Sequence, residues 1–412
     1  MAQFTRSRGL GIQIFRVVIA ASVLQISLFS SLTAFARQGK NQGEFSKFAG
    51  DSPSKALPYA TDVSPAMTTQ DVAAALRKVA DWQLSRSEAH FNRDWTFNVL
   101  YAGFMEVPEA VSGKKYRDAM RAMGKNFKWN LNATDFSNRD FANDQALAQT
   151  YLKLYQLDHL PEMMRPTQVH MDQMLQQVNP SDRLVWWWCD ALFMAPSTLA
   201  RLSQITQEKK YLDYMDREWW RTSDALYDQK RHLFYRDARF LDRREPNGQP
   251  IFWARGNGWV LAGLARVLQA MPDDYPTRPR YVAQFKQIAA ALVDLQGADG
   301  LWRAGLLDAD AHPMPETSGT SLITYGLAYG VNAGLLDRRE FEPHIKSAWR
   351  GLVAHIYADG RLGAIQPVSD APGGFNPTSS YVYGVGAFLM AGSEIYRMCE
   401  QTVEHSVDRS RD

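Results

Sequence analysis

Apolar residues recur with the helical period along most of the chain. Residues 68–83 begin with the capping-box-like Thr68-Thr69-Gln70-Asp71 and place Val72, Leu76 and Val79 on one face. Further segments with this period lie at 94–108, 115–127, 144–157, 166–178, 188–207, 210–228, 257–271, 281–296, 318–334, 338–357 and 380–399. This spacing predicts a closed or solenoidal array of helical hairpins.

Two stretches interrupt the helical pattern. The stretch His232–Ile251 contains Leu233-Phe-Tyr235 and the turn signal Pro246-Asn-Gly248, so a small hairpin or a long loop is expected. The stretch Gly360–Phe375 is rich in glycine and proline and predicts a second long loop. Long loops in a compact helical domain are more often functional than accidental.

The first 36 residues have the composition of a secretory signal. Arg6, Arg8 and Arg16 precede an apolar run over Val17–Phe35, and Ala34-Phe-Ala36 fits a cleavage site. An uncleaved membrane anchor is the alternative, because the run is long for a signal. We therefore predict a periplasmic or secreted protein with no stable membrane insertion after cleavage.

The rest of the chain divides into three parts by composition. Residues 37–66 predict a flexible leader, 67–400 the main helical domain, and 401–412 a polar tail. The net charge of +2 and the lack of a basic helix face exclude a nucleic-acid partner. Cys189 and Cys399 provide no disulfide framework, although they could pair with each other. The scattered histidines contain no metal-ligand motif, so we expect no metal and no cofactor.

Asp190 follows three consecutive tryptophans, Trp186, Trp187 and Trp188, in the stretch Val185–Phe193. One interpretation is an ionised helix cap that accepts backbone N–H bonds. The other is a desolvated carboxyl with a raised pKa, which can donate a proton near neutral pH. The stretch alone leaves both interpretations open.

A second carboxylate, Asp144, stands at a predicted helix start in Asn138–Tyr151. On spacing alone an N-cap is the favoured interpretation. A pair formed with Asp190 is the alternative, because glycoside hydrolysis usually needs two carboxyl groups at a set separation.

The segment Phe252–Val260 carries a candidate sugar-binding turn. Two glycines flank Asn257, and Arg255 and Trp259 bracket the turn, which suits the recognition of an acidic sugar. The alternative is a helix start capped by Asn257, with Trp259 in the core. The segment has no phosphate-binding glycine motif.

Three of these stretches together resemble signatures of glycoside hydrolase family 105, the unsaturated rhamnogalacturonyl hydrolases and their relatives. They are Asn143-Asp-Gln-Ala-Leu-Ala-Gln-Thr-Tyr-Leu152, Trp188-Cys-Asp-Ala-Leu-Phe-Met-Ala-Pro196 and Trp253-Ala-Arg-Gly-Asn-Gly-Trp259. Asp94-Trp-Thr-Phe-Asn-Val-Leu-Tyr-Ala-Gly103 and Glu316-Thr-Ser-Gly-Thr-Ser321 are similar to others, in the family's order from about residue 70 to 400. The resemblance implies an all-α fold, an (α/α)6 barrel of six helical hairpins.

The resemblance also implies a reaction and its residues. Family members hydrate the enol ether of a 4,5-unsaturated uronic acid: an aspartic acid protonates C4, water adds at C5, and the hemiketal collapses. Asp190 matches the proton donor and Asp144 the second essential aspartate. Arg255 and Trp259 match substrate-contacting positions, and Trp188 matches an aromatic residue two positions before the acid.

Asn257 and Arg236 complete the candidate substrate-binding residues. Arg236 stands where many pectin-directed members have a histidine, which argues against rhamnogalacturonan specificity. Arg236 and Arg239 either hold a differently placed anionic group or pair with Asp237 and Asp242.

We therefore expect a monomeric hydrolase that removes unsaturated uronic acid from the non-reducing end of lyase-generated oligosaccharides. A conventional inverting glycosidase acting on saturated sugars with Asp144 and Asp190 is one alternative. A non-catalytic glycan-binding helical-repeat protein is the other.

Overall fold

Helices dominate the computed structural model, which describes residues 49–132, 141–177 and 183–409. They are α2 (Thr69–Ser87), α3 (Trp95–Glu106), α4 (Glu109–Ser112), α5 (Lys115–Asn126), α6 (Ala142–Asp158), α7 (Arg165–Leu175), α8 (Ala191–Met194), α9 (Pro196–Thr206), α10 (Lys209–Leu226), α11 (Ala254–Ala270), α12 (Arg278–Val293), α13 (Thr317–Asn332), α14 (Arg338–Val353) and α15 (Val382–Arg409). Short 3₁₀ turns lie at Glu88–His90, Pro161–Met163 and Ala238–Phe240. The strands β1 (Gly50–Asp51) and β4 (Ser380–Tyr381) form one antiparallel pair, and β2 (Tyr227–Asp228) and β3 (Leu233–Phe234) form another.

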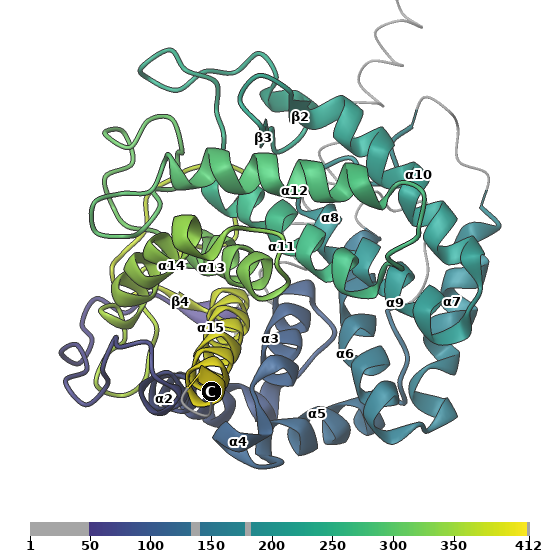
Figure 1. Ribbon diagram of the computed structural model, residues 1–412, viewed down its shortest axis with the longest axis horizontal. Helices are drawn as coiled ribbons and strands as arrows, with labels where there is room; N and C mark the ends of the chain where they lie inside the picture. The colour runs from purple at the N-terminus through teal and green to yellow at the C-terminus, as the bar shows by residue number, and fades with distance from the viewer. Residues whose placement is uncertain (1–48, 133–140, 178–182, 410–412) are drawn as a thin grey trace, which may run out of the picture. The chain divides into compact units, whose positions relative to one another are not determined.

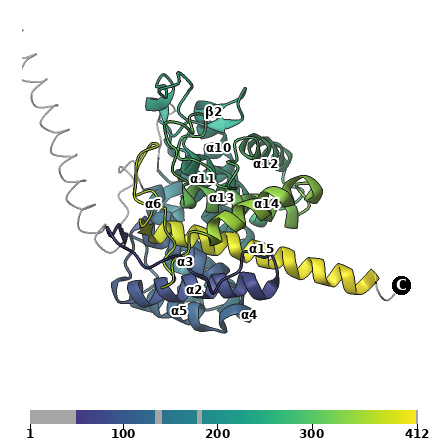
Figure 2. The same cartoon turned by 90° about the vertical axis from the view of Figure 1, so that its left-hand side faces the viewer.

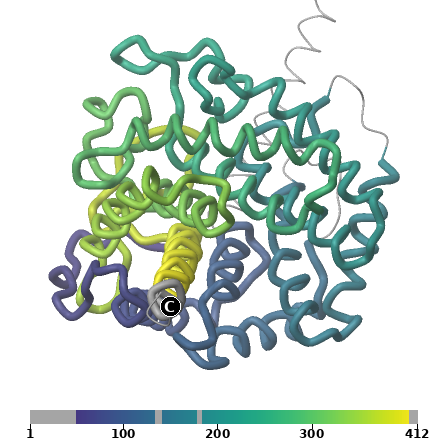
Figure 3. Tube along the Cα trace, in the orientation of Figure 1, coloured from purple at the N-terminus to yellow at the C-terminus, as the bar shows by residue number. Residues whose placement is uncertain are grey.

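Six helices pack side by side in a closed ring. In order they are α3, α6, α9, α11, α13 and α15, and α15 closes the ring against α3. Along the chain they alternate with α2, α5, α7, α10, α12 and α14, which lie around them. Figure 1 shows the chain returning on itself, with α15 in yellow beside α3 in blue, and Figure 3 traces the same path. The predicted (α/α)6 barrel of helical hairpins is confirmed.

The inner and outer helices differ in how many of their residues are buried. In α13, 15 of the 16 residues are buried. In the outer helix α14 only 7 of the 16 are buried, all on one side. A helix that is apolar all round is stable only when it is surrounded by other elements, whereas an amphipathic helix can cover the outside. No helix of the described segments has the length and apolarity needed to cross a bilayer.

Close backbone approach lets the ring close between α3 and α15. A methyl group added at Gly103 would lie 2.5 Å from the carbonyl oxygen of Gly386, and one added at Gly386 would lie 2.3 Å from that of Val99. Only residues without a Cβ fit where two helix backbones come this near.

The first residues of several inner helices meet at one end of the ring, which we call the amino end. Trp95, at the start of α3, stacks on Tyr383 of α15 with ring centroids 5.3 Å apart. Arg255 of α11 donates to Ser318 Oγ of α13 at 3.3 Å. These four helices therefore run in parallel, and the loops that precede them gather over the amino end.

The predicted helix over 188–207 is divided in the structure. A single turn, α8, ends at Met194, and α9 begins at Pro196. Proline has no backbone N–H and cannot continue the hydrogen-bond ladder of a preceding helix. The break keeps Asp190 at the start of its own short turn at the amino end.

The two ends of the described chain are more ordered than their composition predicted. From Ala49 the predicted leader is attached to the barrel: β1 pairs with β4, Tyr59 pairs with Tyr357, and Arg361 bonds to Asp51. Backbone pairing of this kind has no signature in composition. At the other end α15 continues through the predicted tail to Arg409, and Figure 2 shows its last turns extending beyond the other helices. The predicted signal, residues 1–36, lies outside the described residues.

A buried charged cluster occupies the opposite, carboxyl end of the ring. The Glu106 carboxylate, on a side chain only 4% exposed, lies 2.5 Å from Lys153 Nζ, 3.2 Å from Arg266 Nη1 and 3.2 Å from Arg397 Nη2. Burial alone would raise the pKa of Glu106, but the three cations hold it well below its usual range. One carboxylate thus joins α3 to α6, α11 and α15.

We predict that Glu106→Gln lowers the free energy of unfolding by about 3 kcal/mol, because it leaves the buried Arg266 and the part-buried Lys153 without this counter-charge, whereas Arg397 keeps Glu394. Urea unfolding followed by circular dichroism measures the loss. The matched control is Glu109→Gln, which removes a half-exposed ion pair with Arg117 and is expected to cost less than about 1 kcal/mol. Equal losses in the two variants would contradict the role given to Glu106.

Candidate active site

Asp190 is placed by a short stretch of backbone pairing. The Cys189 N–H donates to the Arg236 carbonyl oxygen at 2.8 Å, and Trp188 forms an antiparallel bridge with Asp237. Asp190 occupies the residue before α8, yet its side chain makes no capping hydrogen bond to that turn. The interpretation of Asp190 as a helix cap is therefore not supported.

The surroundings of Asp190 favour its protonated form. The residue is 8% exposed, and burial raises the pKa of its carboxyl above the ordinary value. The charge of Arg236, the Cys189 thiol and the charge of Arg255 offset this rise only in part. The Arg236 Nε–Asp190 Oδ2 distance of 3.6 Å is too long for a hydrogen bond, so the offset is electrostatic. A carboxyl of this kind can donate a proton near neutral pH.

Arg236 belongs to a cluster of charges beside Asp190. Its Nη1 donates to Asp237 Oδ2 at 2.7 Å, and Arg239 Nη2 donates to the same oxygen at 2.9 Å. Both guanidinium groups lie over the ring of Trp187, 5.3 and 5.9 Å from its centroid. The predicted pairing with Asp237 is present, and this single buried carboxylate is shared by two cations. Arg239 Nη2 also donates to Asp370 Oδ2 at 2.8 Å, so the two cations are matched by two carboxylates.

Asp144 lies in the first turn of α6, where Asn132 Nδ2 donates to its Oδ1 at 2.8 Å. The helix is fastened to α8 by Gln149, whose Nε2 donates to the carbonyl oxygens of Phe193 and Met194 at 2.8 and 3.1 Å. Asp144 precedes Gln149 by about one and a half turns, and Asp190 precedes Phe193 by about one turn. The two aspartates therefore lie at the same, amino end of the ring.

Arg255 faces the protein rather than an open cavity. It is 1% exposed, stacks on Trp253 at 4.3 Å, and donates at 2.8 Å to the carbonyl oxygens of Gln366 and Pro367. These acceptors lie in the predicted loop 360–375. In this structure Arg255 holds that loop in place and acts on Asp190 through its charge, and it does not present its guanidinium to a ligand.

Glu316 holds the same loop from the start of α13. Its carboxylate accepts the N–H groups of Ser318 at 3.0 Å and Gly319 at 2.5 Å, which caps the helix, and the N–H of Gln366 at 3.0 Å. The residue is fully buried. The sequence flagged Glu316–Ser321 only as a motif, because the partner in the loop is 50 residues away.

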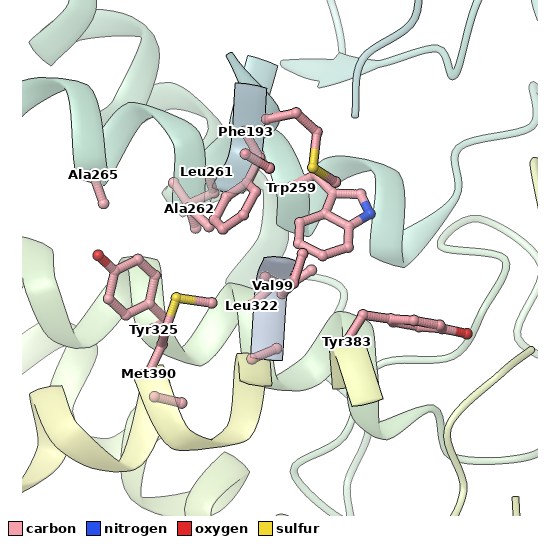
Figure 4. Close-up of a cluster of buried hydrophobic side chains, with 14 of the residues drawn as sticks. Val99, Phe193, Trp259, Leu261, Ala262, Ala265, Leu322, Tyr325, Tyr383 and Met390 are labelled. Atoms are coloured by element: carbon pink, nitrogen blue, oxygen red, sulfur yellow. The ribbon is translucent and has the colours of Figure 1, made fainter. Parts of the chain in front are cut away.

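Trp259 and Asn257 are enclosed in the structure. Trp259 is 1% exposed and packs on Phe193 with centroids 4.8 Å apart, as Figure 4 shows. Asn257 is also fully buried, and its side chain bonds to both the N–H and the carbonyl of Phe234. The core position of Trp259 was one of the two predictions. Asn257 does not cap α11, and instead fastens β3 to its first turn. Neither side chain is presented to a ligand.

The sequence predicted one aromatic residue beside the acid, Trp188. In the structure Trp187 also lies in this region. Trp188 is 3% exposed and its ring lies 5.0 Å from that of Trp187. Trp187 is only partly buried, and the guanidinium groups of Arg236 and Arg239 lie over its ring. Trp187 is thus a residue beside Asp190 to which the sequence reasoning gave no separate role, since its contacts with Arg236 and Arg239 leave no local pattern.

No metal-binding group is found in the part of the chain that the structure describes. Within 49–132, 141–177 and 183–409, no three His, Cys, Asp or Glu side chains lie together in a way that could hold a metal ion. The two cysteines are both buried and unpaired with each other.

Comparison with known families decides what kind of protein carries this site. The model of glycosyl hydrolase family 88 matches residues 69–399. The chain belongs to that family. The family 88 match covers all inner helices up to Cys399, with both aspartates and the loops above the amino end. The protein is therefore a glycoside hydrolase, as the resemblance to this group of enzymes predicted, and a purely glycan-binding role is excluded as its main activity.

Two similar proteins with curated names align with this family 88 chain over most of their length. It is 37% identical to an unsaturated 3S-rhamnoglycuronyl hydrolase of Formosa agariphila, over 80% of this chain and 92% of the relative. It is 31% identical to a protein of the same name from an Alteromonas species, over 84% of this chain and 94% of the relative.

Solved structures show the same barrel. A family 88 hydrolase from Bacteroides vulgatus is 30% identical, with a TM-score of 0.75, over 80% of this chain and 99% of that one. A family 105 hydrolase from C. acetobutylicum is 21% identical, with a TM-score of 0.67, over 78% of this chain and 99% of that one. This likeness shows that the two chains share a fold.

Proposed function

We propose that this enzyme removes a 4,5-unsaturated uronic acid from the non-reducing end of oligosaccharides in which that residue is linked to rhamnose. Support comes from the two relatives named as unsaturated rhamnoglycuronyl hydrolases, which this chain covers almost completely. The observation that carries the proposal is the buried Asp190 carboxyl, whose pKa is raised by burial, at 3.6 Å from the Arg236 guanidinium. That pairing suits a substrate with both a basic carbon and an anionic group.

Asp190 starts the reaction as a general acid. Its proton moves to C4, the electron pair of the C4–C5 double bond forms the new C–H bond, and positive charge develops at C5 and the ring oxygen. The carboxylate left on Asp190 is stabilised by Arg236 at 3.6 Å. The negative charge on Asp190 and the positive charge on the sugar form at the same time and close to each other. Their attraction stabilises the transition state.

Water then completes the reaction. It attacks C5 and gives up a proton to the Asp190 carboxylate, which restores the acid for the next cycle. The C5 hemiketal opens to a ketone, the ring oxygen stays on C1 as a hydroxyl, and the C1 hemiacetal releases the remaining oligosaccharide. The sum of these steps is the addition of one water molecule.

Arg236 and Asp144 hold the substrate in this proposal. Arg236 binds the C5 carboxylate, with Asp237 fixing the guanidinium and Trp187 forming a wall behind it. Asp144, oriented by Asn132, accepts a hydrogen bond from a sugar hydroxyl and adds negative charge near the developing cation.

The first prediction from this mechanism concerns Asp190→Asn, which keeps the shape of the side chain and removes its transferable proton. It should lower the turnover of a lyase-generated unsaturated disaccharide by about 10²–10⁴-fold. The loss of the enol ether's ultraviolet absorbance measures turnover. Asp242→Asn, a change at an exposed residue of the same loop, serves as the control and should leave the rate unchanged. Full activity in Asp190→Asn would refute the assignment, and hydrolysis of saturated analogues would favour the inverting alternative.

A second prediction concerns the pH profile. Because Asp190 must be protonated, kcat falls as the pH rises through its pKa, and the charge of Arg236 lowers that pKa. Arg236→Gln removes this charge, so the alkaline limb of the kcat profile should move to higher pH while KM rises. Arg236→Lys keeps a charge and should move the limb less. A shift of the limb to lower pH in Arg236→Gln would contradict this arrangement.

We further propose that residues 1–36 direct the export of the enzyme, which acts as a periplasmic or secreted monomer. The arginines before the apolar run Val17–Phe35 and the site Ala34-Phe-Ala36 support export. The mature protein should begin near Arg37, which mass spectrometry of the N-terminal peptide checks, and light scattering should give one chain per particle. An N-terminus that retains residues 1–36 would favour the membrane anchor.

A further inference from the structure

A buried thiol lies against the proposed acid. Cys189 is fully buried, and its Sγ donates to Asp190 Oδ2 at 3.4 Å. It forms no disulfide with Cys399, which is buried and free as well. A buried free cysteine usually serves as a small apolar side chain that fills space. Cys189 differs, because its sulfur is in contact with the carboxyl of a titrating neighbour.

Two chain segments fix the position of this sulfur. On one side the Cys189 N–H donates to the Arg236 carbonyl oxygen at 2.8 Å. On the other side the first turn of α11 comes so near that a methyl group added at Gly256 would stand 3.1 Å from Sγ. A residue without a Cβ at this position leaves the sulfur the room that it occupies. The backbone of both segments therefore holds the thiol beside Asp190.

The neighbours of the Asp190 carboxyl gather at one of its two oxygens. The Cys189 thiol donates to Oδ2, and Arg236 Nε lies 3.6 Å from the same oxygen. This Nε is buried and has no hydrogen-bond partner among the residues that the structure describes. In a neutral carboxyl the carbonyl oxygen is the better acceptor, so the two groups select Oδ2 for that role. Oδ1 is the oxygen left to carry the proton.

The thiol acts as a donor and does not itself titrate with the acid. Burial raises the pKa of Cys189 well above its ordinary value, and the charge of Asp190 raises it further. Cys189 therefore keeps its proton while Asp190 titrates, and provides no thiolate that could act as a nucleophile. A thiol is also a weaker donor than a hydroxyl. A stronger donor would favour the ionised form of Asp190 and lower its pKa further.

We propose that Cys189 is a positioning residue of the acid: its thiol holds Oδ2, directs the proton on Oδ1 toward the substrate, and supports the carboxylate after the proton has left. The inference rests on the proposed function and adds a residue to it. When the proton moves from Oδ1 to C4, negative charge spreads over both oxygens, and the thiol and the Arg236 guanidinium already stand beside Oδ2. No proton or electron pair moves to or from the sulfur.

The charged groups around Asp190 come from three elements. Arg236 and Asp237 belong to the paired loop, Arg255 belongs to α11, and Asp144 lies on α6 at the same end of the ring. The two guanidinium groups stay charged throughout. Burial would raise the pKa of Asp237, but the hydrogen bonds from two arginines hold it below its ordinary value. Since variants at position 189 leave all these groups in place, a difference between their pH profiles reports on the donor at that position.

The first test changes this donor in both directions and follows kcat on the unsaturated disaccharide against pH. Cys189→Ser supplies a stronger donor, so the alkaline limb of the kcat profile should move to lower pH by about half a unit, with most of kcat retained below the limb. Cys189→Ala removes the donor, so the limb should move to higher pH. In this variant kcat below the limb should also fall about tenfold, because the proton on Oδ1 is no longer directed at C4. KM should change less than about twofold in both variants.

Cys399→Ser makes the same change at the other buried cysteine and is the matched control. Its Sγ donates to the Met67 carbonyl oxygen at 3.2 Å, about 24 Å along α15 from Tyr383 at the amino end. Its kcat profile should be that of the unchanged enzyme. Limbs that move in the same direction in Cys189→Ser and Cys189→Ala, or in neither, would overturn the inference, since a packing defect alone does not reverse its sign between the two.

A second test needs no substrate. In Cys399→Ala enzyme Cys189 is the only cysteine, and Raman spectroscopy detects its S–H stretching band in a region free of other protein bands. A carboxylate is a stronger acceptor than a neutral carboxyl, so the band should move to lower frequency as the pH rises through the pKa of Asp190. In Asp190→Asn/Cys399→Ala the band should stay in one place.

A band that does not move with pH while Asp190 is present would overturn the inference. If the unchanged enzyme consumes no unsaturated substrate, the proposed function fails instead. The band then still decides whether the thiol is bonded to the Asp190 carboxyl.

Discussion

The site depends on one short backbone pairing, between Cys189 and Arg236. The hydrogen bond between their main chains sets the acid and the cation side by side without a direct hydrogen bond between their side chains. A closer ion pair would keep Asp190 ionised, and a more distant cation would leave the developing carboxylate without support. The pairing thus fixes a separation at which burial still raises the pKa of the carboxyl and the cation offsets the rise only in part.

The first turns of the inner helices hold this pairing in place. Asn257 bonds to the main chain of Phe234, two residues before Arg236, and so ties the paired loop to α11. Cys189 lies against the same helix: a methyl group at Gly256 would stand 3.1 Å from its sulfur. Arg255 and Glu316 form hydrogen bonds to the main chain of Gln366, and these bonds hold the loop 360–375 in place. The signature segments therefore form a platform at the amino end, and the side chains of Asn257, Arg255 and Glu316 bond to the loops.

The sequence was sufficient for the barrel and insufficient for the packing of the side chains around Asp190, while the catalytic roles of Asp144 and Asp190 stay predictions. Helical period sets the inner and outer helices, because burial and periodicity are linked within each segment. The roles of Trp259 and Asn257 were open because a tryptophan beside a glycine turn fits a core and a binding surface equally well. Trp187, Arg239 and the attachment of Gly50–Asp51 to Ser380–Tyr381 arise from contacts between segments far apart in the chain. No local pattern encodes such contacts.

The two ends of the ring shift the pKa of a buried carboxyl in opposite directions. The difference follows from the number of cations close to each carboxyl. Glu106 has three cations within 3.2 Å, so its pKa falls despite burial. Asp190 has one at 3.6 Å, so burial prevails and its pKa rises. The first arrangement binds four helices together and has no chemistry to perform. The second gives up that stabilisation and has a raised pKa, which is the shift that the proposed role of Asp190 as an acid requires. One scaffold therefore supports both, because the helices fix how many charges reach each carboxyl.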